Sequence, residues 1–217
     1  MTGHGPIVDA GLRAAVSSAA SWETIRDAAM GDLASQPNKA TASRYSDLLT
    51  ALRVLDPIEA WLPTRNQFAR LTGAPKHHLA DPALAARLLS LTDRHLIAAT
   101  ERSEGAAHDG TFLGALFESL VALSVRTYAQ SFDGRTYHLR TQGGRHEVDL
   151  IVETDHGVLG IEVKLGASPD DRDVRHLTWL RERLGADLLD AVVVTTGPEA
   201  FRRSDGIAVV PLALLGP

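Results

Sequence analysis

Asp149, Glu162 and Lys164 are the residues whose types and spacing best suit chemistry on a phosphate ester. Two carboxylates held a few ångströms apart repel each other unless a cation neutralises them, and a divalent metal ion does this. A lysine ammonium is a compact charge that orients a water molecule or contacts a phosphate. The three side chains therefore predict a metal site with a lysine beside it, provided that the fold brings them together.

A β-hairpin would bring these residues together. Before the turn Asp155–Gly157, the residues Val148, Leu150 and Val152 alternate with their neighbours, and after it residues 158–163 are mostly apolar and β-branched, which is typical of two paired strands. If the hairpin is centred between Asp155 and His156, the residue numbers of each pair on the two strands add up to 311. Asp149 then lies opposite Glu162, and Glu147 lies opposite Lys164. Because strand side chains alternate with a period of two, all four then project from one face. A loop of odd length would shift this register by one residue.

The composition is that of a soluble globular protein. The 217 residues are 44% hydrophobic and 23% charged, enough for one large or two small domains, and two are expected. The absence of cysteine excludes thiolate metal sites and cysteine nucleophiles, and it suits a reducing compartment. No secretory signal and no apolar window of membrane-spanning length is present, so we expect a cytoplasmic protein with no membrane partner.

The net charge of −5 is unevenly distributed along the chain. Residues 1–100 carry 10 basic and 9 acidic side chains (+1), whereas residues 101–217 carry 12 and 18 (−6). This balance gives no general attraction for nucleic acid. The acidic excess of the second part agrees with a metal site counted without its cation, and equally with an acidic surface.

The first part, residues 1–100, has the element order of a winged helix-turn-helix. Helices are expected at 9–20, 21–33 and 39–55, short strands at 58–62 and 76–80, and a further helix at 82–91. In the third helix, the side chains expected to face inward are those of Tyr45, Leu48, Leu52 and Leu55. The adjacent His77 and His78 point to opposite faces of a strand, so we interpret them as structural residues rather than metal ligands.

The third helix would be the recognition helix of a DNA-binding domain. Its basic residues predict phosphate contacts from Lys39, Arg44 and Arg53. Thr41 and Ser43 would lie near base edges. The alternative is that this domain serves only as a protein-interaction module, because its charge of +1 gives little electrostatic attraction for DNA.

The second part, residues 111–217, predicts an α/β sandwich around a mixed sheet, after a polar linker at 101–110. The expected order is a helix at 111–128, a strand at 136–140, the hairpin at 145–164, a helix at 168–184, and strands at 189–195 and 207–212. The first helix is apolar nearly all round and is therefore expected to be buried, yet it contains Glu118. A buried carboxylate needs a compensating partner, which would be a metal ion, Lys164 or an arginine.

Helix-borne Glu118, Asp149 and the ExK tripeptide at 162–164 resemble the PD-(D/E)xK nuclease superfamily, which includes archaeal Holliday-junction resolvases. The resemblance implies a restriction-endonuclease-like fold in which Asp149, Glu162 and the Val163 carbonyl bind Mg²⁺, or Mn²⁺ in its place. It also implies that Glu118 completes the metal site and that Lys164 assists the attacking water. The implied activity is metal-dependent cleavage of DNA phosphodiesters.

Several segments, in one order along nearly the whole chain, resemble the C-terminal half of prokaryotic AAA+ ATP-binding proteins. They are residues 44–45 (RY), 76–82 (KHHLADP), 116–118 (LFE), 140–141 (RT), 147–149 (EVD), 160–164 (GIEVK) and 206–212 (GIAVVPL). Those proteins consist of an ATPase domain, a winged helix and a C-terminal domain of unknown function with a restriction-endonuclease-like fold. The resemblance therefore implies the same two domains that the patterns predict.

The ATPase half of that family has no counterpart in this sequence. A P-loop places its lysine directly after glycine, whereas Lys39, Lys76 and Lys164 follow Asn, Pro and Val. We therefore expect no ATP site, and a separate ATPase or another protein is a candidate partner.

Two functions are open at this point. In the first, the chain is a Mg²⁺-dependent DNA endonuclease that uses Asp149, Glu162 and Lys164. In the second, it is a catalytically silent DNA- or protein-binding regulatory module, and the same residues form a salt-bridge network with Glu118. Serine and cysteine hydrolase chemistry is not expected, because the sequence has no Gly-x-Ser-x-Gly and no cysteine.

Overall fold

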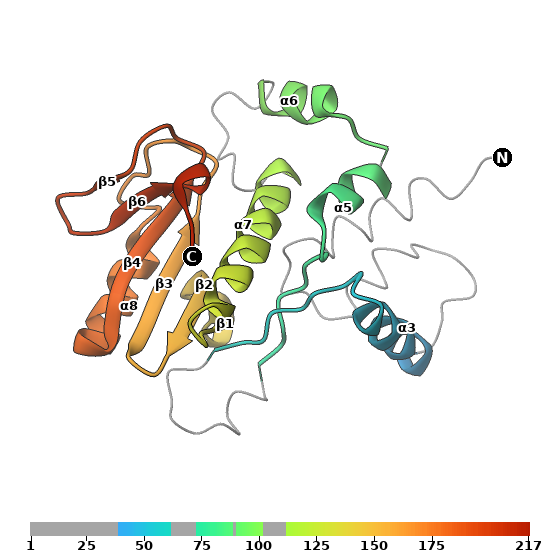
Figure 1. The fold of residues 1–217 in the computed structure, drawn as a ribbon, viewed down its shortest axis with the longest axis horizontal. Coiled ribbons are helices and arrows are strands. Elements are labelled where there is room, and N and C mark those ends of the chain that lie inside the picture. Colours follow the sequence, from blue (N-terminus) through green and yellow to red (C-terminus); the bar gives the residue numbers. More distant parts are fainter. Residues whose placement is uncertain (1–38, 62–72, 89, 102–111) are drawn as a thin grey trace. The chain divides into compact units, whose positions relative to one another are not determined.

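The computed structural model describes residues 39–61, 73–88, 90–101 and 112–217 (Figure 1). The chain divides into two compact units, which are described one at a time. Unit 1 consists of Met1–Ile58 and Ala74–Ser119, and unit 2 consists of Glu59–Gly73 and Leu120–Pro217. Helices and a mixed sheet together make an α/β fold, as the sequence predicted.

A six-stranded mixed sheet is the centre of unit 2 (Figure 1). Its strands are β1 (Arg135–Arg140), β2 (Glu147–Thr154), β3 (Gly157–Val163), β4 (Leu188–Thr195), β5 (Phe201–Arg202) and β6 (Ala208–Pro211). They lie in the order β1-β2-β3-β4-β6-β5. The first three strands are antiparallel, β3, β4 and β6 are parallel, and β5 is antiparallel to β6. Only β5 was not predicted, because two residues are too few to show an alternating pattern.

The central hairpin of β2 and β3 has the predicted register. Its pairs run from Thr154↔Gly157 at the turn to Leu150↔Ile161, and the two numbers of each pair add up to 311. The turn has two residues, and Gly157 after it has a φ of 146°, a backbone conformation that favours glycine. The even-length turn therefore places every paired side chain on the predicted face.

A β-bulge in β2 lies beside the end of this regular pairing. In the β1–β2 pair, Tyr137 is opposite Ile151 and Leu139 is opposite Val148, so β2 has one residue more than β1 in this interval. A bulge bends its strand and redirects side chains. Asp149 lies within the bulged interval, and its side chain is therefore placed by the local geometry rather than by the alternation on which the prediction relied.

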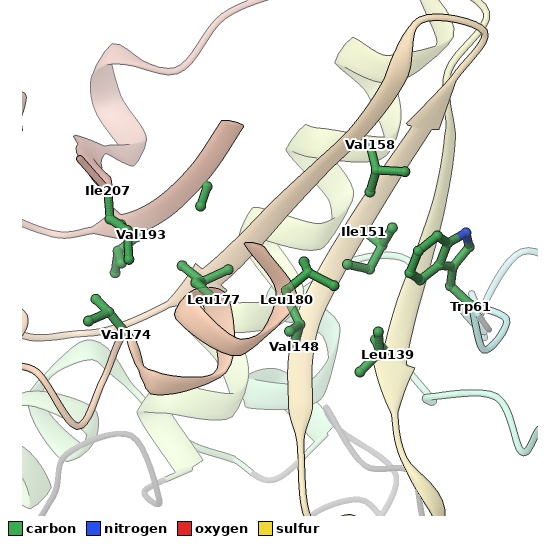
Figure 2. Close-up of a cluster of buried hydrophobic side chains, with 11 residues drawn as sticks. Trp61, Leu139, Val148, Ile151, Val158, Val174, Leu177, Leu180, Val193 and Ile207 are labelled. Carbon is green, nitrogen blue, oxygen red and sulfur yellow. The ribbon is translucent and has the colours of Figure 1, made fainter. Parts of the chain in front are cut away.

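Helix α8 (Arg175–Leu184) connects the parallel strands β3 and β4 and packs on one face of the sheet (Figure 2). Its side chains Leu177 and Leu180 are fully buried. With Val174 they form one core cluster, whose other members are Trp61, Leu139, Val148, Ile151, Val158, Ala191, Val193 and Ile207. Gly160 of β3 permits this close packing, because a Cβ atom there would lie 2.6 Å from Leu180 Cδ2.

Helix α8 begins at Arg175, and the preceding segment 168–174, predicted to be helical, forms turns instead. The Asp170 carboxylate accepts hydrogen bonds from the backbone N–H groups of Asp173 and Arg172, at 3.1 and 2.7 Å. These bonds hold the pKa of Asp170 below its usual value. An aspartate that bonds nearby backbone amides in this way stabilises a turn in competition with a helix.

The segment Glu59–Trp61 runs along the outer edge of β1 in unit 2. Two hydrogen bonds join it to the backbone of His138, at 2.6 and 3.0 Å, and the Trp61 indole donates to Glu153 Oε1 at 3.1 Å. The segment thereby covers an edge of the sheet. The strand predicted at 58–62 pairs with the segment predicted at 76–80 through Ile58, which forms a bridge with Lys76, whereas Glu59–Trp61 lies along β1 instead. A short apolar strand does not indicate its own partner.

In unit 1 the described helices are α3 (Lys39–Ala51), α5 (Pro82–Leu88), α6 (Asp93–Glu101) and the first part of α7 (Phe112–Gln130). Antiparallel bridges join Leu55 to Leu79 and Ile58 to Lys76. The buried core of this unit includes Leu55, Leu79, Ala85 and Leu116. The helices predicted at 9–20 and 21–33, and the predicted linker from residue 102 onward, lie outside the described residues.

Helix α3 turns a different face to the core from the one predicted. Leu48 and Leu52, which were expected to face inward, are 53% and 63% exposed. Leu49 packs against the core instead, and Leu55 packs as predicted. For Leu52 the prediction was wrong because the helix ends early: α3 stops at Ala51, and Arg53 after it adopts a left-handed φ of 57°.

Helix α7 is buried along one stripe rather than nearly all round as predicted, since Leu120 and Leu123 are exposed. Among the described residues it is the one helix that is long and apolar enough to cross a membrane. Leu116 is buried in unit 1, and Val121, Val125 and Ala129 are buried in unit 2. This stripe of buried residues at helical spacing is typical of a helix that packs on its own protein. The cytoplasmic location stays a prediction.

Candidate functional site

The site lies at the edge of the unit 2 sheet where β2 starts and the parallel strands β3 and β4 end. Asp149 is near the start of β2, Glu162 is near the end of β3, and Lys164 follows β3 directly. Ligands of open α/β sheets bind preferentially at this edge, outside the carboxyl ends of the parallel strands. The sheet thus brings together three of the predicted site residues.

Asp149 is fixed by a backbone hydrogen bond. The Val163 N–H donates to Asp149 Oδ2 at 3.0 Å. The N–H and C=O of one strand residue point toward the same neighbouring strand, so the Val163 carbonyl faces the side on which Asp149 lies. Two members of the predicted ligand set therefore lie on the same side of β3.

Glu162 and Lys164 are neighbours on one face of the chain at the end of β3. Glu162 Oε2 lies 4.0 Å from Lys164 Nζ, and the two side chains are 5% and 19% exposed. A carboxylate buried to this degree is costly unless cations or hydrogen bonds compensate it. The Lys164 N–H donates to the Val194 carbonyl at 2.9 Å, which ties the lysine backbone to β4.

Glu118 has a partner within unit 1 that the sequence did not indicate. Its Oε1 lies 2.5 Å from Lys76 Nζ, and the side chains are 16% and 4% exposed. On the next residue of α7, the Ser119 hydroxyl lies 3.1 Å from His78 Nδ1. The partner was expected to be a metal ion, Lys164 or an arginine, so Lys76 corrects that expectation. Lys76 precedes the two histidines, and all three side chains are buried.

A cluster of rings beside the site was also missed. The His146 ring, just before β2, stacks on Trp179 of α8, with centroids 4.1 Å apart and planes 8° from parallel. The edge of a second imidazole, His176, meets His146 at 5.7 Å. Arg175 Nε donates to His176 Nε2 at 3.0 Å. The spacing of His176 and Trp179 on one face of a predicted helix was the available signal.

The pKa of His176 lies below its usual value. Burial lowers its pKa most, and the positive charges of Arg175, His146 and Lys164 lower it further, whereas Glu147 acts in the opposite direction. Lys164 and Glu147 therefore lie within electrostatic reach of this imidazole. The ring cluster and the candidate catalytic residues belong to one edge of unit 2.

The oxygen ligands at this edge fit a hard divalent cation. Asp149, Glu162 and the Val163 carbonyl offer oxygen atoms, and Mg²⁺ is usually bound by one or two carboxylates, with water and substrate phosphate as the other ligands. Within the described ranges, the structure shows no group of three or more His, Asp or Glu side chains arranged for a metal ion. A transition-metal site built from imidazoles is therefore not indicated by these residues.

The residues predicted to contact DNA lie on or just after α3. Ser43 and Arg44 are exposed on the helix, and Arg53 is exposed directly after it. The backbone of Lys39 and Thr41 belongs to α3, but their side chains lie outside what the structure describes. An open depression of about 600 Å³ adjoins the end of this helix, lined by Ser46, Asp47, Thr50, Ala51, Arg53, Pro57, Pro75 and His77.

The comparison with known families adds one decisive observation. Residues 113–215 match the model of a domain of unknown function, DUF4143. This DUF4143 segment, known as a C-terminal domain of AAA-ATPase-associated proteins, agrees with the predicted resemblance to the C-terminal half of such proteins. It contains Glu118, Asp149, Glu162 and Lys164.

The part of the chain before the DUF4143 segment matches a second family model. Residues 7–95 match another domain of unknown function, DUF8612, which includes α3 and the bridged segments of unit 1. The curated proteins contain no match to the chain.

Proposed function

We propose that the DUF4143 segment is a PD-(D/E)xK nuclease domain that hydrolyses DNA phosphodiesters with Mg²⁺ or Mn²⁺. The observation that carries the proposal is the hydrogen bond from the Val163 amide to Asp149, next to the buried Glu162 and its lysine. These two carboxylates, the Val163 carbonyl and the Lys164 ammonium group belong to the edge of the sheet where α/β proteins bind ligands.

In this proposal Asp149, Glu162 and the Val163 carbonyl hold the cation. When bound, the ion would lower the pKa of a water molecule and neutralise the negative charge that develops on the phosphate. The hydrogen bond from the Val163 N–H, at 3.0 Å to Oδ2, orients the Asp149 carboxylate. Lys164 positions the attacking water or stabilises the phosphate oxygens as a point charge.

The role of Glu118 is narrower than the resemblance implied. Because Lys76 already compensates its charge, Glu118 needs no metal ion to be stable where it is. The proposed metal set therefore rests on Asp149, Glu162 and Val163, which all belong to unit 2.

The test is cleavage of linear, supercoiled and branched DNA by the full chain, with Mg²⁺, Mn²⁺ or EDTA. Glu162→Gln and Lys164→Met should each lower the rate at least about a hundredfold, because each removes one charged group from the site. Glu182→Gln on the exposed side of α8 is the matched control and should cut as well as the original chain. Cleavage that survives both site variants would overturn the proposal.

A silent binding module is the second candidate, and one observation favours it. The two glutamates of the set each have a lysine nearby, and Asp149 accepts a backbone hydrogen bond. Such a network is also what a structural remnant of a nuclease site would show. The absence of cleavage, together with a melting temperature that Mg²⁺ does not change, would select this candidate.

Under either candidate, we propose that unit 1 contacts DNA through α3. Exposed Arg44 and Arg53, with Ser43, are the described residues that would reach the duplex, alongside Lys39 and Thr41. A protein partner with ATPase activity is the other proposed ligand, since the chain has no P-loop of its own. Salt-dependent DNA binding that Arg44→Ala and Arg53→Ala weaken would support the DNA proposal.

A further inference from the structure

Two segments that border the candidate site are joined by the ring cluster. His146 lies directly before β2, which carries Asp149. His176 and Trp179 lie on α8, which follows the loop after Lys164. The stack of His146 on Trp179 and its contact with His176 therefore connect the start of one strand to the start of the helix.

We propose that His176 is a positioning residue for this edge of the sheet, and that it acts only as a neutral imidazole that accepts the Arg175 hydrogen bond. The inference rests on the proposed function, because the edge that it holds in place carries Asp149 and Lys164. His176 touches none of the reacting groups and acts through His146 and Arg175.

The hydrogen bond defines the charge state that the arrangement needs. Arg175 Nε donates to His176 Nε2 at 3.0 Å, so Nε2 must carry a lone pair and the ring proton is on Nδ1. A protonated imidazole has donors on both nitrogens. On protonation this bond is lost, and an N–H group faces another N–H group.

The surrounding charges favour the same state. The groups that face His176 are Arg175 on α8, His146 before β2, Lys164 after β3, and Glu147 at the start of β2. Three of these are cations or become cations in acid, and one is a carboxylate. A charge on His176 would therefore repel both the helix residue beside it and the lysine of the site.

The backbone passes this effect on to β2. The His146 N–H donates to Thr141 Oγ1 at 2.9 Å, and the Thr141 N–H donates to the His146 carbonyl at 2.9 Å. These two hydrogen bonds hold the His146 backbone at the end of β1. The His146 ring therefore keeps its stack on Trp179 only if α8, which carries Trp179, stays in place. When the imidazole pair separates, the residue before β2 loses its ring contact with His176 of the helix, and the bulged Asp149 lies three residues further on.

The experiment is an NMR titration of the full chain from about pH 8 to pH 5, because this range covers the usual titration of histidine. The chain has 9 His and 3 Trp, few enough to assign by substitution. We expect His176 to titrate below the ordinary value of 6.5. The Trp179 indole N–H and the amide signals of Asp149 and Lys164 should shift with the same midpoint.

Three variants separate a positioning role from a general effect of acid. His176→Gln keeps an acceptor near Nε2 but cannot titrate, so the three reporter signals should keep their neutral-pH positions down to about pH 5. His176→Lys carries a permanent charge and should show the acid positions even at about pH 7.5. His156→Gln, at an exposed turn position of the same unit, should leave the midpoint unchanged.

The proposal is overturned if His176 titrates at 6.5 or above, or if the reporter signals of His176→Gln still shift with the midpoint of the original chain. Should His176→Lys not fold, the Gln variant decides alone. Cleavage in the same samples distinguishes the two proposals. A chain that never cuts DNA but shows these shifts retains the positioning role and loses the proposed function.

Discussion

Lys76 Nζ and Glu118 Oε1 lie 2.5 Å apart in unit 1, and neither side chain is more than 16% exposed. Lys76 also exchanges two backbone hydrogen bonds with Ile58, at 2.8 Å each. The pair thus ties the first part of α7 to the bridged segment that crosses unit 1. Glu118 is accordingly a structural residue first, whatever it contributes to a metal site.

Removing one partner of this pair should destabilise the protein strongly. Glu118→Gln leaves the Lys76 ammonium buried without its carboxylate, and we expect a loss of about 3 kcal/mol in the free energy of unfolding. The measurement is urea denaturation followed by circular dichroism. The double variant Lys76→Met, Glu118→Gln removes both charges and should recover most of the loss. If the single variant unfolds like the original chain, the ion pair contributes nothing.

Two substitutions of Asp149 separate its effect on stability from its effect on DNA cleavage. Asp149→Asn keeps a side-chain oxygen for the Val163 N–H, so its free energy of unfolding should fall by less than about 1 kcal/mol. Asp149→Ala leaves that N–H without its acceptor and should cost about 1–3 kcal/mol. Both variants remove the carboxylate, and under the proposed function both should stop cleavage. An Asn variant that cuts DNA normally would show that this carboxylate is not a metal ligand.

The hairpin shows what the sequence can predict. The pairing of Leu150 with Ile161 followed from alternation and a two-residue turn, which are both local. The contact of Lys76 with Glu118 joins residues far apart in the chain, and no periodicity indicates which cation a buried glutamate meets. The position of Asp149 was predictable in part. Its strand, β2, followed from the local pattern, but the bulge that contains it depends on the pairing of β2 with β1.

Gly160 is expected to tolerate no side chain. A Cβ atom there would lie 2.6 Å from Leu180 Cδ2 and 3.2 Å from Leu177 Cδ2, and both leucines are fully buried. Gly160→Ala should therefore force α8 away from β3 and cost about 1–3 kcal/mol in thermal unfolding. Gly166→Ala is the control, since nothing lies within 4 Å of its Cβ position. If Gly160→Ala and Gly166→Ala unfold at the same temperature, α8 moves away from β3 without a loss of stability.

The lowered pKa of His176 predicts how stability depends on pH. Below 6.5 an unfolded chain takes up a proton at this residue before the folded chain does, so the free energy of unfolding falls as pH decreases from 6.5 to the folded pKa. Above 6.5 both states are neutral, and this residue contributes no slope. His176→Gln should reduce the slope in that window, measured as melting temperature against pH. An unchanged slope would assign the acid sensitivity to other groups.

Helix ends explain the remaining differences from the predicted fold. Residues 168–174 contain a helix-like pattern, but Asp170 bonds the backbone of its own turn, and α8 starts only at Arg175. In α3 the left-handed Arg53 ends the helix, so the periodicity that included Leu52 and Leu55 extended past the helix. The start of α8 and the end of α3 are thus decided by hydrogen bonds from a side chain to the backbone and by a single φ angle. These features follow from packing more than from composition.

Arg203 is expected to hold the loop that follows Lys164. Its guanidinium donates to the Pro169 carbonyl at 2.5 Å, to Asp171 Oδ1 at 2.6 Å and to Asp205 Oδ2 at 3.0 Å. A lysine cannot satisfy three acceptors in this planar arrangement. In Arg203→Lys, the amides of the loop should therefore exchange with solvent faster, by about tenfold or more if roughly 1.4 kcal/mol of local stability is lost.

Arg202→Lys is the matched control for this prediction. The Arg202 guanidinium donates two hydrogen bonds to Asp190, at 2.8 and 3.0 Å, and one to the Gly206 carbonyl at 2.7 Å, rather than to the loop that Arg203 contacts. Hydrogen exchange in that loop should then be unchanged, although the pair of Arg202 with Asp190 is weakened. Faster exchange in both variants would mean that the loss of either arginine loosens the loop. Faster exchange in Arg203→Lys alone would show that one arginine fixes the path from Lys164 to the start of α8.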